Sequence, residues 1–246
     1  MGGRGIRDRA WRALGAPIRQ FRRSRFAALA PLDRVIEVPI AQIAYRIEDV
    51  EFLRRTPPGA IVPHFPDLQR FGGANRLDRK FASIIAHFRE GVPWRETPLF
   101  SVDYAPRLAE RRIRGCATLA ELEAYYVATY DPLYERIRRE GVAADRFGRG
   151  VPPLYVHISE YGEFIWPAEG GHRLAICAAL GHRSVPARIH ARHRRWQALR
   201  DSVAADLAAG RAIDPALARH PDLGDLLRPA GAPAAPVAAL PRVRPA

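Results

Sequence analysis

The chain has 246 residues, of which 48% are hydrophobic, so it can bury the core of one ordinary domain with extensions, or of two small domains at most. No stretch approaches the roughly 18 consecutive apolar residues of a membrane-spanning helix. The two cysteines, Cys116 and Cys177, match neither a zinc-binding spacing nor a disulfide framework. We therefore expect a cytoplasmic protein, with a peripheral position at a membrane left open.

The net charge of +13 is typical of nucleic-acid-binding proteins, but most of it lies near the ends of the chain. Residues 1–30 contain eight arginines and one aspartate, and residues 228–246 contain three arginines and no acidic residue. The body between them has only a small positive excess, which does not favour binding to duplex DNA. Only one basic residue, Lys80, is lysine, which is typical of a GC-rich coding sequence.

Segment 1–31 is predicted to be a basic leader. Apolar residues recur at helical steps through 6–29 with arginines between them, and Pro17 interrupts the pattern. Such a helix can bind DNA or an anionic membrane surface, or it can pack on its own domain. Val35–Ile40 then alternates apolar and polar residues and predicts an opening edge strand.

Residues 75–140 are predicted to form a helical insertion. Leu77–Phe88 carries apolar residues at helical spacing, and the glycine at 91 stops the pattern. Thr118 and Glu121 have the spacing of a capping box and open a second helix, which is expected to end near residue 129.

Two residues predict a break after that second helix. Asp131-Pro132 is typical of a helix start, so a separate third helix is expected over Leu133–Glu140, closed by Gly141.

The remaining pattern alternates strands and helices. Strands are expected over Leu154–Ile158, Phe164–Trp166 and Val185–Ile189, and helices over 172–180 and 192–209. The main domain is therefore predicted to span 32–210. A C-terminal extension over 211–246 follows, and its Ala/Pro-rich end after Arg228 is expected to be disordered.

The stretch from Glu169 to Ile176 carries the most specific chemistry. Gly170 and Gly171 allow the backbone to approach a ligand closely and to adopt dihedral angles that other residues avoid. The helix that follows presents amides without intrahelical partners and the positive end of its dipole, which together suit an anion. His172 and Arg173 add donors in the first turn.

These residues resemble a known family. Gly170-Gly171-His172-Arg173-Leu174-Ala175-Ile176, followed by Ala179-Leu180-Gly181 and Val185-Pro186, is similar to the second box of the ParB N-terminal domain/sulfiredoxin superfamily. Val38-Pro39-Ile40-Ala41-Gln42-Ile43 is similar to its first box. The superfamily includes the partition protein ParB, sulfiredoxin and free-serine kinases. The resemblance implies a ParB-like nucleotide-binding domain in which Gly170, Gly171, His172 and Arg173 hold phosphates.

The sequence departs from the best-known members. Sulfiredoxin has its reactive cysteine directly before the His-Arg pair, where this chain has Gly171, so sulfinic acid reduction is not expected. The partition protein has a helix-turn-helix domain after its nucleotide domain. Fewer than 50 residues follow Arg200 here, so we expect no such domain and no sequence-specific DNA binding through it.

Further candidates lie outside the glycine turn. Arg188 and Arg194 belong to a basic run over residues 188–195 that completes a polyphosphate pocket, binds nucleic acid or forms a solvated helix start. Glu169 and Glu37 are the leading candidates for a catalytic carboxylate, the alternative being ordinary surface positions. No metal site made of protein ligands is predicted, because the histidines at 190 and 193 lack a carboxylate or thiol at matching spacing.

The sequence thus predicts an α/β or α+β fold, with a small mixed sheet, packed helices and the helical insertion. The leading hypothesis is a phosphotransferase acting on a small-molecule acceptor, or an NTPase, that uses ATP or another nucleoside triphosphate with Mg²⁺. The alternative is a non-catalytic, nucleotide-responsive binding module that engages DNA or an anionic membrane surface through residues 1–30. A nuclease is a third option, but the glycine-turn region lacks the acidic cluster that it would require.

Overall fold

The computed structural model describes residues 26–71, 76–142, 154–167 and 169–227. Within them helices pack around a single mixed β-sheet, so the predicted α/β or α+β class is confirmed. The predicted basic helix over 6–29 and the Ala/Pro-rich tail lie almost entirely outside the described residues. No helix in the described ranges is long and apolar enough to cross a membrane.

The sheet has the strand order β1-β7-β5-β6-β2-β4. β3 pairs with the end of β7, beyond the residues that pair with β1. The strands are β1 Val35–Pro39, β2 Ile43–Arg46, β3 Ala60–Val62, β4 Gln69–Arg70, β5 Leu154–Ile158, β6 Phe164–Trp166 and β7 Ser184–His193. β7 is antiparallel to β1 and parallel to β3 and β5. The expected opening strand and the three C-terminal strands are therefore present.

Register places one face of the sheet under α6 (Gly171–Ala179). Leu154 pairs with Ala187 on β7, which pairs in turn with Ile36 on β1, and all three side chains are buried. A methyl carbon of Leu154 lies 3.5 Å from where a β-carbon on Gly170 would be, so this face carries α6. Because side chains alternate along a strand, the neighbouring positions on β1 and β7 face the other way.

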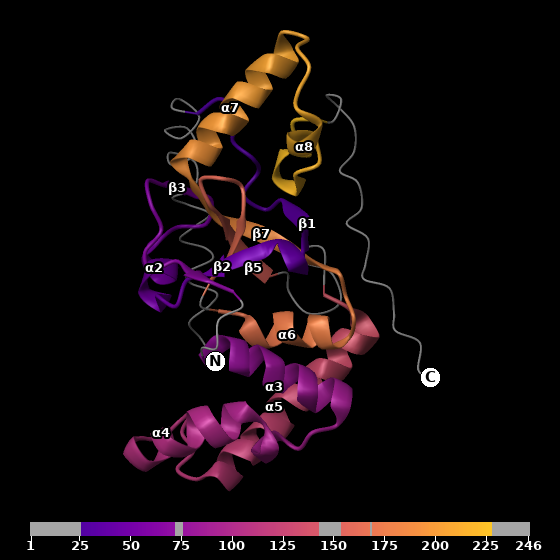
Figure 1. The fold of residues 1–246 in the computed structure, drawn as a ribbon. Helices are drawn as coiled ribbons and strands as arrows, with labels where there is room; N and C mark the ends of the chain where they lie inside the picture. The colour runs from indigo at the N-terminus through magenta and orange to yellow at the C-terminus, as the bar shows by residue number, and fades with distance from the viewer. Residues whose placement is uncertain (1–25, 72–75, 143–153, 168, 228–246) are drawn as a thin grey trace.

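A helical layer covers α6 on the side away from the sheet (Figure 1). It consists of α3 (Arg76–Glu90), the π-helical turn η3 (Leu99–Tyr104), α4 (Ala105–Glu110) and α5 (Leu119–Glu140). These elements correspond to the predicted insertion. Their aromatic residues join the core around Tyr126, which is fully buried.

The predicted break at Pro132 is wrong, because α5 runs without interruption from Leu119 to Glu140. Tyr126, Tyr130 and Ile137 are buried along one side of the helix, so packing on both sides of the proline holds it together. Asp131 does not cap a new helix. Its carboxylate instead accepts a hydrogen bond from the Trp94 indole N–H at 3.2 Å.

The predicted capping box at the start of α5 takes a slightly different form. The Thr118 hydroxyl accepts from the Glu121 amide at 3.2 Å, as expected. The Glu121 carboxylate, however, accepts from the amide of Ala117, one residue earlier than the usual partner, at 2.7 Å. Both contacts still satisfy backbone donors at the helix start.

The last helix, α7 (Arg194–Ala208), begins later than predicted because β7 continues to His193. The expected helical residues 192 and 193 are strand residues that pair with β5 and β3. After α7 the chain returns through α8 (Pro215–Ala218) and the turn η4 (Pro221–Leu223), which packs beside β1. The described part of the predicted C-terminal extension is therefore packed on the main domain.

Candidate functional site

The glycine turn joins the end of β6 to the start of α6. Gly170 is the N-cap of α6 in the left-handed conformation, with φ of 85°, and its carbonyl accepts from the Leu174 amide at 3.2 Å. The amides of Gly171, His172 and Arg173 precede this first intrahelical bond, so none has an acceptor within the helix. The local structure is the helix N-terminus that the sequence predicts.

The surroundings of the two glycines differ. At Gly170 the positive φ disfavours any residue with a β-carbon, and such a carbon would lie 3.3 Å from a terminal nitrogen of Arg173. At Gly171 a β-carbon would lie 3.5 Å from Nζ of Lys80. Two cationic groups are thus within a few ångströms of the turn.

Lys80 comes from α3, in the helical layer, and not from the motif itself. Its charge also acts on His172, since burial and then the charges of Lys80 and Arg114 lower the pKa of that imidazole well below its ordinary value. His172 is therefore neutral at physiological pH. The positive charge at the turn comes from Lys80, Arg114 and Arg173.

Arg114 reaches this region from a tight turn before α5. Ile113 and Cys116 exchange both backbone hydrogen bonds, and Arg114 and Gly115 between them have φ of 54° and 86°. A non-glycine residue in this conformation is strained. The turn directs the Arg114 guanidinium onto the rings of three α5 tyrosines, with centroid distances of 5.5 Å to Tyr125, 6.0 Å to Tyr126 and 5.7 Å to Tyr130.

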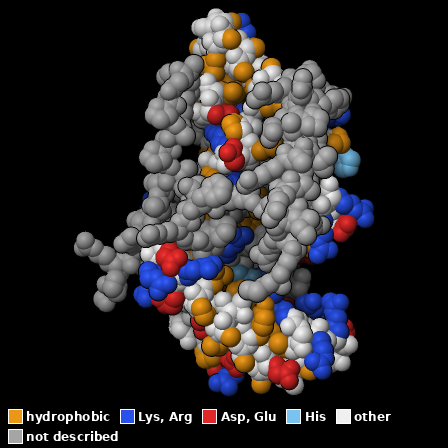
Figure 2. Space-filling view, turned by 180° about the vertical axis from the view of Figure 1, so that it is seen from behind, with side chains coloured by type: hydrophobic (Ala, Val, Ile, Leu, Met, Phe, Trp, Pro, Cys, Tyr) orange, Lys and Arg blue, Asp and Glu red, His pale blue; other side chains and the backbone are white. Residues whose placement is uncertain are grey.

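The same tyrosines hold His172. Its ring stacks on Tyr130 with centroids 3.8 Å apart and an interplanar angle of 10°. Its Nε2 lies 3.3 Å from the Tyr126 hydroxyl, which is 2.5 Å from the hydroxyl of Tyr104. Figure 2, the view from behind, shows Lys and Arg side chains with histidine beside them where the helical layer meets the rest of the molecule.

Of the two candidate carboxylates, Glu169 is at the turn. It is exposed, directly precedes Gly170, and its charge favours the charged form of Arg173. Burial nevertheless lowers the pKa of Arg173 overall, with the Glu169 charge acting in the opposite direction. Glu169 is therefore the acidic group that the structure places beside the expected phosphate ligands.

Glu37 and Arg188 are not brought to the turn. Glu37 follows Ile36 on β1, and Arg188 follows Ala187 on β7, so both face the side of the sheet opposite α6. The Glu37 carboxylate accepts a hydrogen bond from Ser184 at 2.8 Å, and burial raises its pKa.

Arg194 also lies away from the turn, because the alignment of β5 with β7 sets its position. Leu154, beside Gly170, pairs with Ala187, whereas Arg194 begins α7 seven residues further along the chain. At about 3.3 Å per strand residue, this separation is roughly 20 Å.

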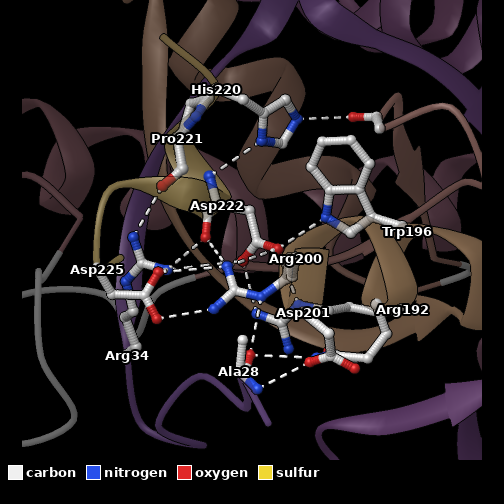
Figure 3. A network of polar contacts seen from close by, with 12 residues as sticks. Ala28, Arg34, Arg192, Trp196, Arg200, Asp201, His220, Pro221, Asp222 and Asp225 are labelled. Carbon is white, nitrogen blue, oxygen red and sulfur yellow. Dashed lines mark hydrogen bonds and ion pairs between the residues drawn. The ribbon is translucent and has the colours of Figure 1, made fainter. Parts of the chain in front are cut away.

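The rest of the predicted basic run is engaged in structural contacts. Arg192 donates to both oxygens of Asp222, at 2.9 and 2.6 Å, and this buried pair belongs to a network that attaches η4 to the domain (Figure 3). Arg200 and the Trp196 indole N–H also donate to residue 222. Arg195 pairs with Glu160 at the surface. Arg192 and Arg195 are therefore close to the glycine turn in sequence, but their charges are engaged by acidic residues elsewhere.

The described residues contain no group of three or more His, Cys, Asp or Glu side chains placed to hold a metal ion. The residues near the turn that sequence reasoning missed are Lys80, Arg114 and Tyr126, all in the insertion. Lys80 alone carried a signal, as the one lysine in an arginine-rich chain. No protein-family model, curated protein or solved structure matches this chain.

Proposed function

We propose that the protein binds the phosphate groups of a nucleotide at the start of α6 and uses them in phosphoryl transfer or nucleoside triphosphate hydrolysis. The observation that carries the proposal is the convergence of Lys80 from α3 with Gly171 and Arg173 of α6. Segments about ninety residues apart in sequence supply these groups.

The chemistry of the turn suits an anion with several oxygens, such as a phosphate, better than a neutral ligand. Amides at a helix N-terminus donate to several oxygens at once, and the helix dipole favours negative charge there. An arginine such as Arg173 can donate two parallel hydrogen bonds to a phosphate, and a lysine such as Lys80 acts as a compact point charge. The two glycines leave room for oxygens to approach the backbone.

The nucleotide we propose is ATP or another nucleoside triphosphate with Mg²⁺. Gly170, Gly171 and Arg173 with Lys80 would hold the phosphates, and a bound Mg²⁺ would neutralise charge that develops on them. Since the turn contributes one carboxylate, Glu169, the metal would take most of its ligands from phosphate and water, as Mg²⁺ often does.

Glu169 is the proposed base toward an acceptor hydroxyl or water. Its exposure and its position beside the turn support this role, whereas the position of Glu37 does not. Most of the rate enhancement would come from positive groups that stabilise the transferred phosphoryl group, as is usual in phosphoryl transfer. Binding without turnover would instead indicate the non-catalytic module.

Calorimetry with ATP and Mg²⁺, combined with assays of hydrolysis and of transfer to small hydroxyl compounds, tests the proposal. We expect Arg173→Ala to weaken binding by about 1.5–3 kcal/mol, the range for a hydrogen bond to a charged group. Arg183→Ala is the matched control, because Arg183 is exposed just after the other end of α6. Equal affinity for ATP in the wild type, Arg173→Ala and Arg183→Ala would refute the site.

A further inference from the structure

His172, Tyr126 and Tyr104 form a chain of hydrogen bonds that connects α6 to the helical layer. The distances are 3.3 Å from His172 Nε2 to the Tyr126 hydroxyl and 2.5 Å from that hydroxyl to Tyr104. Tyr126 is fully buried and Tyr104 is nearly so. We call these three residues the tyrosine–histidine chain.

The protons of this chain can be arranged in two ways. Either Tyr104 donates to Tyr126 and Tyr126 donates to His172, or the histidine donates to Tyr126 and Tyr126 donates to Tyr104. The second arrangement leaves the buried Tyr104 proton without an acceptor among the described residues. Since an unsatisfied buried donor costs about 1–3 kcal/mol, the first arrangement is favoured.

The charged groups around His172 support the same arrangement. Lys80 from α3 and Arg114 from the tight turn disfavour a second proton on the imidazole, and the α5 rings of Tyr126 and Tyr130 enclose it. In a neutral imidazole one nitrogen accepts and the other donates. If Nε2 accepts from Tyr126, the proton is on Nδ1, the nitrogen nearer to the main chain of the first α6 turn.

We propose that the tyrosine–histidine chain fixes His172 as a neutral donor with its proton on Nδ1, and that this N–H joins the first-turn amides in binding the anion. This inference rests on the proposed function and names the role of a residue in the same site. His172 then orients the anion through a hydrogen bond without adding charge, while Lys80, Arg114 and Arg173 supply the positive charge. Tyr126 and Tyr104 are positioning residues that act through His172.

The first test reads the tautomer directly, without a ligand. Side-chain ¹⁵N NMR of His172 in the full chain distinguishes an Nδ1 proton from an Nε2 proton. We expect the Nδ1 form in the wild type and a shift toward the Nε2 form in Tyr126→Phe. Tyr134→Phe is the control, because it removes a hydroxyl from the same helix while its ring stacks on Phe88. An Nε2 proton in the wild type would overturn the proposal.

The second test separates the two ring nitrogens by substitution. The side-chain amide of asparagine is placed like Nδ1, and that of glutamine is placed like Nε2. With pyrophosphate as the probe, we expect His172→Asn to bind within about threefold of the wild type and His172→Gln to bind about tenfold or more weakly, the loss of one hydrogen bond to a charged group. Equal losses in the two variants would overturn the donor role.

The two proposals can fail separately. If the wild type does not bind pyrophosphate but NMR gives the Nδ1 proton, the phosphate function is wrong and the hydrogen-bond chain stands without a ligand role. If the wild type binds pyrophosphate and NMR gives the Nε2 proton, the phosphate site stands and the assignment of His172 is wrong. Thermal unfolding of each variant confirms that it remains folded.

Discussion

Nζ of Lys80 lies 3.5 Å from the position that a β-carbon on Gly171 would occupy. This contact brings the helical layer to the first residue of α6. It also places the Lys80 cation beside the positive end of the α6 dipole, and the two repel each other unless an anion or an acidic group lies near them. The relationship therefore links the fold of the insertion to the chemistry of the turn.

The two glycines of the turn are expected to respond differently to alanine. Gly170→Ala forces a β-carbon into a left-handed conformation, so we expect a loss of about 1–2 kcal/mol in the free energy of unfolding. Gly171→Ala meets Lys80 at an ordinary contact distance, so stability should stay within about 0.5 kcal/mol while pyrophosphate binding weakens. Urea denaturation and calorimetry check both variants. Equal stability of the two would contradict the turn geometry.

The buried ion-pair network is expected to dominate the attachment of η4. Asp222→Ala leaves the buried Arg192 without its carboxylate and takes one of two carboxylates from the buried Arg200, which keeps Asp225, so we expect a loss of about 3–5 kcal/mol. Asp206→Ala, which breaks an exposed pair with Arg211, should cost less than about 1 kcal/mol. Denaturant midpoints measured at neutral pH make the comparison, and similar losses would show that the network is not buried in solution.

The pH dependence of Asp222 follows from the same contacts. Burial raises its pKa, but the charges and hydrogen bonds of Arg192, Arg200 and Trp196 lower it more, to about 2. A carboxylate with a lowered pKa stabilises the fold above its ordinary value of 3.8 and loses that contribution as the pH falls toward 2. We expect the acid unfolding transition in this range to be shallower in the Asp222→Ala variant than in the wild type.

His157 is expected to make the fold acid-sensitive at higher pH. It is fully buried against Phe52, Phe65 and His190, and neither ring nitrogen has a hydrogen-bond partner among the described residues. Burial, followed by the charge of His190, lowers its pKa to about 3. The unfolded chain therefore takes up a proton below pH 6.5 that the native protein does not, so stability falls as the pH decreases from 6.5 toward 3.

Replacement of His157 by leucine tests this expectation. Between pH 6.5 and 4 the wild type should lose stability more steeply, by up to about 1.4 kcal/mol per pH unit for this one group. At pH 8 the variant should be about as stable as the wild type, because the rings of Phe52 and Phe65 pack against residue 157. Parallel pH profiles for the two proteins would contradict the buried, neutral state of His157.

The sequence predicted those parts of the fold that depend on local pattern. The helix start at Gly170, the helices over Leu77–Phe88 and 172–180 and the strands around them follow from spacing and glycine placement alone. The break at Pro132 was wrong because buried tyrosines and Ile137 hold α5 together from outside the local sequence. Residue 192 was expected to begin a helix, but Arg192 is a strand residue whose partner Asp222 is 30 residues away.

The candidate site was predictable only in part. Its backbone lies in one motif, but Lys80, Arg114 and Tyr126 reach it from the insertion, and no local pattern indicates such convergence. Arg188 and Arg194 are close to the motif in sequence but not in space. Arg188 faces the other side of the sheet, and Arg194 lies beyond the far end of β7. Domain boundaries, the basic leader and the choice between enzyme and binding module stay predictions.

The most direct measurement of the central claim is mapping of backbone amide shifts by ¹⁵N NMR during a titration of the full chain with pyrophosphate. If phosphates bind at the glycine turn, the largest saturable changes should occur at the amides of residues 170–173 and near Lys80. They should disappear in Lys80→Met, which keeps the apolar stem. Largest changes at residues 188–195 instead, or no saturable change at the turn, would contradict the account.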